Sequence, residues 1–233
     1  MALAKLVSYS QPYEHFTDAP LIKDVQDMIA YCARVSNPAN QSSTETNERL
    51  INYLIRNKHW SPFEMASATI EIITTRDIAR QILRHRSFSF QEFSQRYAEV
   101  GAVGTGLEFV FREARLQDIK NRQNSIPIEE QDIENKYIAL QWERKQKELI
   151  DWVDNTYRWA LENGIAKEQA RVILPEGLTQ SRLYMAGTIR SWIHYIELRS
   201  ANGTQLEHQK IAKACAKELA KIIPSFFTKT ENT

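Results

Sequence analysis

Cysteine is scarce in this sequence, and that scarcity limits the kinds of protein it can encode. Only two cysteines, Cys32 and Cys215, occur in 233 residues, too few for a disulfide framework or a four-cysteine metal site. Both lie in partly apolar, helical sequence patterns, so we expect them to be buried or half-buried small hydrophobic residues. This usage fits a reducing, cytoplasmic setting.

Long apolar runs and an excess of one charge are also missing. No run approaches the ~20 residues that a membrane-spanning helix needs, and the N-terminus lacks the pattern of a signal peptide. The formal net charge of +1 argues against a protein whose main role is to coat nucleic acid or an anionic membrane. We therefore expect no membrane partner and no nucleic-acid partner. The histidines show no metal-ligand spacing, so we expect no metal site; they are His15, His59, His85, His194 and His208.

Hydrophobic periodicity predicts many helices and a few strands. Capping-box patterns, Ser42 with Glu45 and Thr204 with Glu207, predict two of the helix starts. The predicted strands cover residues 3–9, 67–74, 107–111 and 183–186. The predicted helices cover residues 22–34, about 45–58, 75–84, 127–163, 167–174, 188–199 and 204–223. Residues 85–106 are predicted to be rich in loops. No repeat, linker or domain boundary is evident, so we predict one α+β domain over residues 1–233, with a modest, mainly antiparallel or mixed sheet flanked by long helices.

The densest polar cluster is Arg84–Tyr97, which reads RHRSFSFQEFSQRY. The cations at its start could simply cap the C-terminal end of a helix. Arginine and serine in a loop can also hold a phosphate through bidentate and hydroxyl hydrogen bonds, and nearby aromatic rings can stack on a base. From the pattern alone a solvated surface and a nucleotide-phosphate site both remain open.

The same cluster resembles the signature of the flavin-dependent thymidylate synthases. That family carries Arg-His-Arg, seven residues and then Ser, as in Arg84 to Ser94 here, and Ser89, Glu92 and Arg96 match its longer pattern. Gln91 stands where the family often has Asn. Four further segments, which extend the resemblance over most of the chain, also match: Ala33–Ser36, His59–Glu64, Ala170–Pro175 and Trp192–Arg199.

The resemblance implies a fold, a reaction and an assembly. The expected fold is that of the family, and the expected reaction is reductive methylation of dUMP to dTMP without an enzyme nucleophile. Methylenetetrahydrofolate would give the carbon, and FAD reduced by NADPH would give the hydride. The enzyme would be a homotetramer whose active sites combine residues of several subunits.

Site residues follow from the same matched positions. The resemblance implies FAD binding by His59, Ser61, Glu64, Arg84, His85, Arg86, Glu92, Thr188, Ile189, Arg190 and His194. It implies dUMP binding by Gln81, Ile82, Leu83, Arg84, Glu92, Phe93, Ser94, Gln95, Arg96, Arg171 and Arg199.

Four of these residues have a chemical argument of their own. The dUMP phosphate carries about two negative charges near neutral pH, which Ser94 and Arg96 would hold, with Arg171 reaching in from a neighbouring subunit. Arg199 is expected to be catalytic, because a guanidinium beside the uracil stabilises negative charge on the base. Taken singly, Arg171 and Arg199 could be ordinary helix arginines, and His194 a structural histidine.

Ser94 could also be a nucleophile, which would need an adjacent base. His85 is nine residues away, but no aspartate partner is evident, so we interpret Ser94 as a phosphate ligand. Two other functions stay open: a nucleic-acid-binding module that uses Arg84–Tyr97 as a basic and aromatic surface, and a helical scaffold assembled through residues 127–163.

Overall fold

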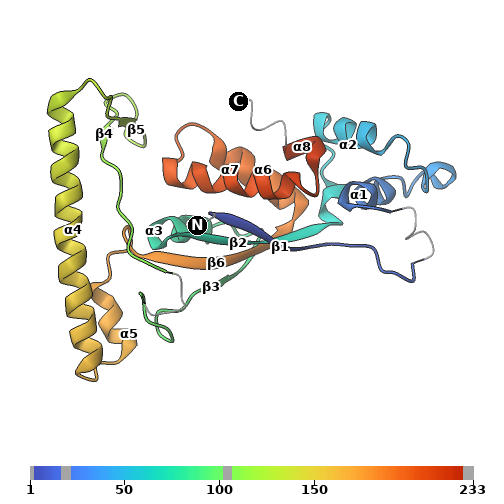
Figure 1. Ribbon diagram of the computed structural model, residues 1–233. Coiled ribbons are helices and arrows are strands. Elements are labelled where there is room, and N and C mark those ends of the chain that lie inside the picture. The colour runs from blue at the N-terminus through green and yellow to red at the C-terminus, as the bar shows by residue number, and fades with distance from the viewer. Residues whose placement is uncertain (1–2, 17–21, 102–106, 228–233) are drawn as a thin grey trace.

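A four-stranded antiparallel sheet forms the centre of the molecule. The computed structural model describes residues 3–16, 22–101 and 107–227. The sheet has the order β1-β2-β6-β3, and Figure 1 shows its long strands running across the middle of the fold. The strands are β1 (Ala4–Tyr9), β2 (Ser67–Thr75), β3 (Ser89–Glu92) and β6 (Gln180–Thr188).

The two faces of the sheet differ in polarity, because side chains alternate along each strand. On one face Ile70 pairs with Met185 and Ile72 with Leu183, and all four are fully buried. On the other face Glu71 pairs with Tyr184, and Tyr184 is exposed. The helices therefore pack on the apolar face, as Figure 1 shows for α6 and α7.

The helices on the apolar face complete the main core. They are α1 (Val25–Ala33), α2 (Asn47–Arg56), η3 (Ser61–Glu64), α6 (Ile189–Ser200), α7 (Leu206–Ala220) and α8 (Pro224–Phe227). Trp192 of α6 is fully buried in this core, and its indole Nε1 donates to the carbonyl of Ala68 at 3.0 Å. We call the sheet and these helices the sheet–helix body.

A second region, residues 113–173, stands at one end of the sheet, and we call it the α4 arm. Figure 1 shows its long helix on the opposite side of the molecule from α1 and α2. Its core is small: Val153, Tyr157, Ala160 and Ala170 of the arm pack together with Val100 and Leu174 from just outside it. Its elements are β4 (Arg115–Gln117), β5 (Ser125–Pro127), α4 (Ile133–Glu162), α5 (Lys167–Ala170) and η4 (Arg171–Ile173). The remaining elements of the chain are η2 (Pro38–Asn40) and α3 (Arg76–Ile82).

One buried glutamine fastens α4 to the segment that runs beside it. Gln146 is 3% exposed; its Oε1 accepts from the Arg112 amide at 2.7 Å, and its Nε2 donates to the Arg112 carbonyl at 2.9 Å. The side-chain amide thus satisfies one backbone residue in the way that a neighbouring strand would. The Arg112 side chain continues into the sheet–helix body, where it pairs with Asp77 and Glu207.

Gly187 near the end of β6 permits a close contact with Phe88. A Cβ added at Gly187 would lie 2.7 Å from Phe88 Cε1, closer than such atoms approach. The Phe88 ring therefore rests directly on the strand backbone, where it also meets Trp192 edge to face at 4.9 Å.

The α+β class and most of the predicted elements are confirmed, with several differences at strands. The strands predicted at 3–9 and 67–74 correspond to β1 and β2, but β6 is longer than the predicted 183–186. The strand predicted at 107–111 is wrong: only an isolated bridge from Phe109 to Thr179 forms there. The strand β3 lies inside the predicted loop 85–106, of which residues 102–106 fall outside the described residues.

Both predicted capping boxes are wrong. The N-cap residues of α2 and α7 are Thr46 and Gln205, and neither makes a side-chain cap hydrogen bond. The helix predicted over 204–223 ends at Ala220. Gly164 is confirmed as the C′ residue of α4, directly after the C-cap Asn163, with φ of +78°. In the described part of the chain, no helix combines the length and the apolarity that crossing a membrane requires.

Candidate functional site

The Arg84–Arg86 triplet lies in a turn just after α3. The helix ends at Ile82, and the His85 amide donates to the Ile82 carbonyl at 3.0 Å. Arg84 and Arg86 are exposed, whereas His85 is half-buried. The turn thus directs two guanidinium groups outward and one imidazole inward.

His85 meets Arg199, the residue expected to be catalytic. Arg199 Nε donates to His85 Nε2 at 2.9 Å. A guanidinium can only donate, so Nε2 accepts and the imidazole is neutral, with its proton on Nδ1. Burial, Arg199 and Arg84, in that order, lower the pKa of His85. This contact joins the triplet to the last turn of α6, 114 positions away.

Beneath this pair lies a layer of buried polar side chains. The His85 ring meets Tyr195 edge to face at 4.9 Å, and the Tyr195 hydroxyl lies 3.1 Å from His208 Nε2. His208 is fully buried, and burial, Arg199 and His85 lower its pKa to about 3. His208 Nδ1 in turn lies 3.2 Å from the side-chain oxygen of Gln81. Gln81 therefore directs its carbonyl inward, toward α7.

A second group gathers where η3 meets the start of α6. Arg190 forms an ion pair with Glu64, and the His194 ring meets Trp60 edge to face at 5.2 Å. His59 lies against Tyr53 at 5.9 Å between ring centroids. Arg190 and His194 lie on α6 together with Arg199; the nine positions from Arg190 to Arg199 correspond to about 14 Å at 1.5 Å per residue.

A third group lies in the loop after β3. Ser94 Oγ accepts from the Arg96 amide at 3.4 Å, and the Arg96 guanidinium lies 3.7 Å from the Glu168 carboxylate. Arg171 Nε donates to the carbonyl of Glu168 at 3.3 Å. Arg171 and Arg96 of one chain thus both contact Glu168; that Arg171 reaches the site of a neighbouring subunit stays a prediction.

Glu92, at the end of β3, and Gln95, in the loop that follows, both face the interior of the protein rather than solvent. Glu92 accepts from Ser181 Oγ at 2.8 Å and lies 3.5 Å from Arg76. Gln95 is 4% exposed, and its Nε2 is buried with no hydrogen-bond partner in the described chain. A buried donor without a partner is costly, so Gln95 marks a place where a ligand could complete the structure.

The remaining expected site residues contribute backbone or packing at these places. Ile82 and Ile189 are fully buried, so only their backbones face a ligand. Thr188 caps α6, where its Oγ1 accepts from the Ser191 amide at 3.2 Å. Leu83 and Phe93 are half-buried, and Ser61 is exposed in η3.

No nucleophile stands out in this arrangement. His85 is turned toward Arg199 and Tyr195, and Ser94 faces the Arg96 amide, so the described contacts give Ser94 no adjacent base. Cys215 is fully buried and Cys32 half-buried, as expected from the sequence, and burial raises the pKa of both thiols. In the described ranges no three histidines, cysteines or acidic residues gather as metal ligands would.

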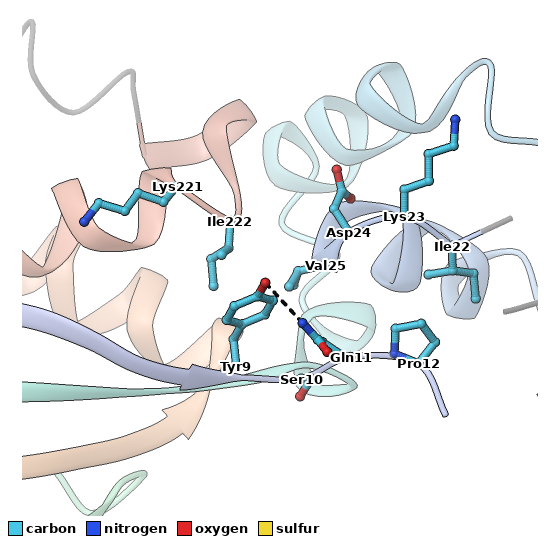
Figure 2. Close-up of a pocket in the computed structure, with 10 residues that line it drawn as sticks. All are labelled: Tyr9, Ser10, Gln11, Pro12, Ile22, Lys23, Asp24, Val25, Lys221 and Ile222. Carbon is cyan, nitrogen blue, oxygen red and sulfur yellow. Dashed lines mark hydrogen bonds between the residues drawn. The ribbon is translucent and has the colours of Figure 1, made fainter. Parts of the chain in front are cut away.

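A cavity of about 320 Å³ lies elsewhere, between the end of β1, the start of α1 and the end of α7. Figure 2 shows its lining residues, among them Lys23 and Lys221, and the hydrogen bond from Gln11 to Tyr9. None of the expected site residues lines it. The nearby start of α1 is already capped by Asp24, which accepts from the Asp27 amide at 2.8 Å. We therefore assign the site to the three groups above.

Sequence reasoning overlooked the residues that support the site. Tyr195, His208, Gln205 and Glu207 link α6, α7 and α3 through side-chain contacts. The only sequence signal was that Tyr195 and His208 fall on the buried faces of amphipathic helices. Such positions usually indicate packing, and a single sequence does not reveal which polar groups will meet.

The comparisons with known proteins agree with one another. A family model described as thymidylate synthase complementing protein matches residues 20–225. A probable flavin-dependent thymidylate synthase of Paramecium bursaria Chlorella virus 1 is 48% identical over 222 residues, covering 95% of each chain. A flavin-dependent thymidylate synthase of a Synechocystis species is 44% identical over 224 residues, again covering 95% of each. A solved structure of the UMP/dUMP methylase PolB from Streptomyces cacaoi, bound with 5-Br UMP, matches with a TM-score of 0.75 and 27% identity, covering 97% of this chain and 91% of that one.

Proposed function

This chain belongs to the flavin-dependent thymidylate synthase family, and we propose that it converts dUMP to dTMP at the site built around His85 and Arg199. It is an enzyme of the methyltransferase class with FAD as its cofactor. The observation that carries the assignment of the site is the hydrogen bond from Arg199 to His85. It brings the Arg-His-Arg triplet and the arginine at the end of α6, which are far apart in the sequence, into direct contact.

The residues along α6 and in the triplet fit FAD. Exposed guanidinium groups suit a diphosphate, and Arg84 and Arg86 provide them in the described structure. Near the start of α6, Arg190 and His194 lie beside η3 and the residues before it, which carry Glu64, Ser61 and His59. When bound and reduced by NADPH, FAD supplies the hydride of the reaction. Three further residues would support this site chiefly by stabilising the backbone around it: Glu92 at the end of β3, and Thr188 and Ile189 at the start of α6.

The loop after β3 suits the phosphate of dUMP. Arg96 and Glu168 are both more than half exposed, and an exposed ion pair of this kind contributes little, about 0–1 kcal/mol. A phosphate with two negative charges can therefore take Arg96 from Glu168 at small cost. Ser94, Arg171 and the unpaired amide of Gln95 would complete the cradle, and Phe93 would support it.

Arg199 would act on the uracil ring. A positive guanidinium beside the base stabilises negative charge as the ring is polarised, which raises electron density at the carbon that attacks. Neutral His85 accepts from Arg199 Nε, so it orients the guanidinium without adding a competing positive charge. This route uses no enzyme nucleophile, in keeping with the buried thiols and with Ser94 as a phosphate ligand.

The α4 arm supports a homotetramer whose subunits share active sites. Along α4 the side chains of Tyr137, Trp142, Trp152 and Trp159 are 44–64% exposed. Large aromatic side chains in such number on one helix are typical of a protein interface. We propose that subunits associate through this helix. Methylenetetrahydrofolate is the proposed carbon donor, and the cytoplasm is the proposed location.

The nucleic-acid-binding and scaffold alternatives gain no support. His85, Glu92 and Gln95 are engaged with or buried in the protein, so Arg84–Tyr97 does not form one continuous basic surface. The named relatives are thymidylate synthases.

The direct experiment is anaerobic incubation of the purified, flavin-loaded protein with dUMP, methylenetetrahydrofolate and NADPH. We expect bleaching of the flavin by NADPH and formation of dTMP, measured by mass spectrometry. Absence of dTMP while flavin is bound and reduced would contradict the proposed function. A reaction without methylenetetrahydrofolate serves as the control.

A further inference from the structure

A chain of side-chain hydrogen bonds runs from a charged residue near the α4 arm to Gln81. It begins at Glu207, which pairs with Arg115 at 2.7 Å and with Arg112 at 3.0 Å. Burial alone would raise the pKa of Glu207, but the hydrogen bonds from Arg115 and Gln205 and the charge of Arg112 lower it overall. The carboxylate is therefore ionised and can only accept hydrogen bonds.

Because the Glu207 carboxylate can only accept, it determines which group donates and which accepts in every later hydrogen bond of the chain. Gln205 Nε2 donates to Glu207 at 3.0 Å, so Gln205 directs its oxygen the other way. Gln81 Nε2 donates to that oxygen at 2.9 Å, which turns the Gln81 oxygen toward His208 Nδ1 at 3.2 Å. His208 Nδ1 must then carry the proton, and its Nε2 accepts from the Tyr195 hydroxyl at 3.1 Å.

This chain leaves Gln81 with a defined polarity. Its oxygen is held against His208, which has no exposed surface. Its amino group lies beside half-buried Gln205, which lines a cavity of about 530 Å³. Gln81 itself is half-buried. One of its two Nε2 hydrogens is committed to Gln205, so the second is the hydrogen that the side chain has left for a ligand.

We propose that His208 is a positioning residue that makes Gln81 a fixed hydrogen-bond donor, and that this selects uracil over cytosine. The inference rests on the proposed function and on the contact of Gln81 with dUMP that the family resemblance implies. The two bases differ at C4, where uracil has a carbonyl acceptor and cytosine has an amino donor. A donor fixed at Gln81 forms a hydrogen bond with the C4 carbonyl of uracil. Against cytosine the same donor faces the amino group, which is also a donor.

The experiment measures the dissociation constants of dUMP and dCMP for the flavin-loaded protein by calorimetry, with no turnover needed. We expect the wild type to bind dUMP about 100-fold more tightly than dCMP, a ratio typical of a single well-placed hydrogen-bond donor. His208→Leu removes the donor to Gln81, which frees the amide to rotate. We expect the dUMP to dCMP ratio to fall to about tenfold or less.

Matched variants separate this role from packing. His208→Asn keeps an N–H near the Nδ1 position and should restore most of the ratio. Cys215→Ala changes another fully buried side chain of α7 outside the chain of hydrogen bonds, and should leave the ratio unchanged. Gln205→Met breaks the chain at a half-buried position, so it gives a second test if His208→Leu fails to fold, and it should also lower the ratio.

Each outcome bears on a different claim. A wild-type ratio that persists in His208→Leu and Gln205→Met, or equal weakening of both nucleotides, would overturn the role of His208 while the proposed function stands. Wild-type protein that loads with flavin but does not bind dUMP would overturn both.

Discussion

The sheet–helix body and the α4 arm bury their side chains to very different degrees. In the body, α6 alone has five buried residues among its 12, whereas the 30-residue α4 has four. Trp192 of α6 has no exposed surface, while Trp152 of α4 is 60% exposed. The body is thus stabilised within one chain, and the arm presents apolar surface that a second chain would cover. The two regions thus differ in how far their stability is supplied within one chain.

The candidate site draws on both regions. Arg199 and His208 belong to the body, and His85 packs against it through Tyr195. Arg96 contacts α5 of the arm through Glu168. We therefore expect changes in the body to act on chemistry and folding, and changes in the arm to act on association and local opening. Four predictions test that division, from the largest expected effect to the smallest.

The largest effect should come from Arg199→Ala, which removes charge stabilisation at the base without touching the arm. We expect the turnover number to fall by about 10²–10³-fold or more, as for loss of a preorganised donor, while flavin stays bound. Single-turnover formation of dTMP and the flavin absorbance measure the two properties. Arg158→Ala, at an exposed ion pair of α4, is the matched control. Near-normal turnover in Arg199→Ala would refute the catalytic assignment.

Matched leucines compare the two regions directly. Leu183→Ala in β6 leaves a cavity in the main core and should lower the free energy of unfolding by about 2–5 kcal/mol. Leu140→Ala in α4, where the side chain is 65% exposed, should cost far less in dilute protein. Denaturant unfolding at two protein concentrations measures both, and only the Leu140 effect should depend on concentration. Equal, concentration-independent losses would break the comparison.

Acid should weaken the body through its buried histidines. The pKa of His208 is about 3 in the folded protein, against an ordinary value of 6.5. Between these values the unfolded chain binds a proton that the folded chain does not. The free energy of unfolding is therefore undiminished by His208 above pH 6.5, and it decreases as the pH falls from 6.5 toward 3. We expect the free energy of unfolding to change by about 1.4 kcal/mol per pH unit because of this one group. His85, whose pKa is also lowered, adds in the same direction.

Unfolding free energies measured across this pH range should show a shallower slope for His208→Gln than for the wild type. His15→Gln, at an exposed position, is the control. Identical slopes for His208→Gln and the wild type would mean that His208 is not buried in its neutral form.

The smallest effect should come from Gln146→Ala, which removes two hydrogen bonds to the Arg112 backbone. A buried backbone group without a partner costs about 1–3 kcal/mol, and here that cost should appear locally. Hydrogen–deuterium exchange should speed up in α4 and around Arg112 and stay unchanged in β2 and β6. Faster exchange throughout the sheet would show that the arm and the body unfold as one unit.

The sequence predicted elements best where one periodic pattern dominates. The strand at 67–74 and the helices that became α4 and α6 have such patterns, and they were confirmed. Short strands were not predictable, since β3, with Ser89, Phe90, Gln91 and Glu92, owes its conformation to pairing with β6 rather than to its own composition. The capping-box predictions were wrong because the N-cap residues of α2 and α7 are Thr46 and Gln205, one or more positions after the predicted serine and threonine.

For the site, the resemblance indicated the residues but not their arrangement. Arg199 and His85 were both expected, and their hydrogen bond depends on how α6 packs beside α3. His208 and Gln205 lie at positions where the sequence indicates only a helix face. Pairwise contacts between distant polar residues are a property of the tertiary structure, so no local pattern reveals them.

The contact between Phe88 and Gly187 implies that these two positions evolve together. Any side chain at 187 would overlap the ring of Phe88, so glycine is the only residue accepted there while an aromatic ring occupies position 88. A smaller residue at 88 would release that restriction, and a double-mutant cycle with Phe88→Ala and Gly187→Ala should give a favourable coupling energy. Among homologous sequences the pair should therefore covary, with glycine at 187 wherever 88 is aromatic.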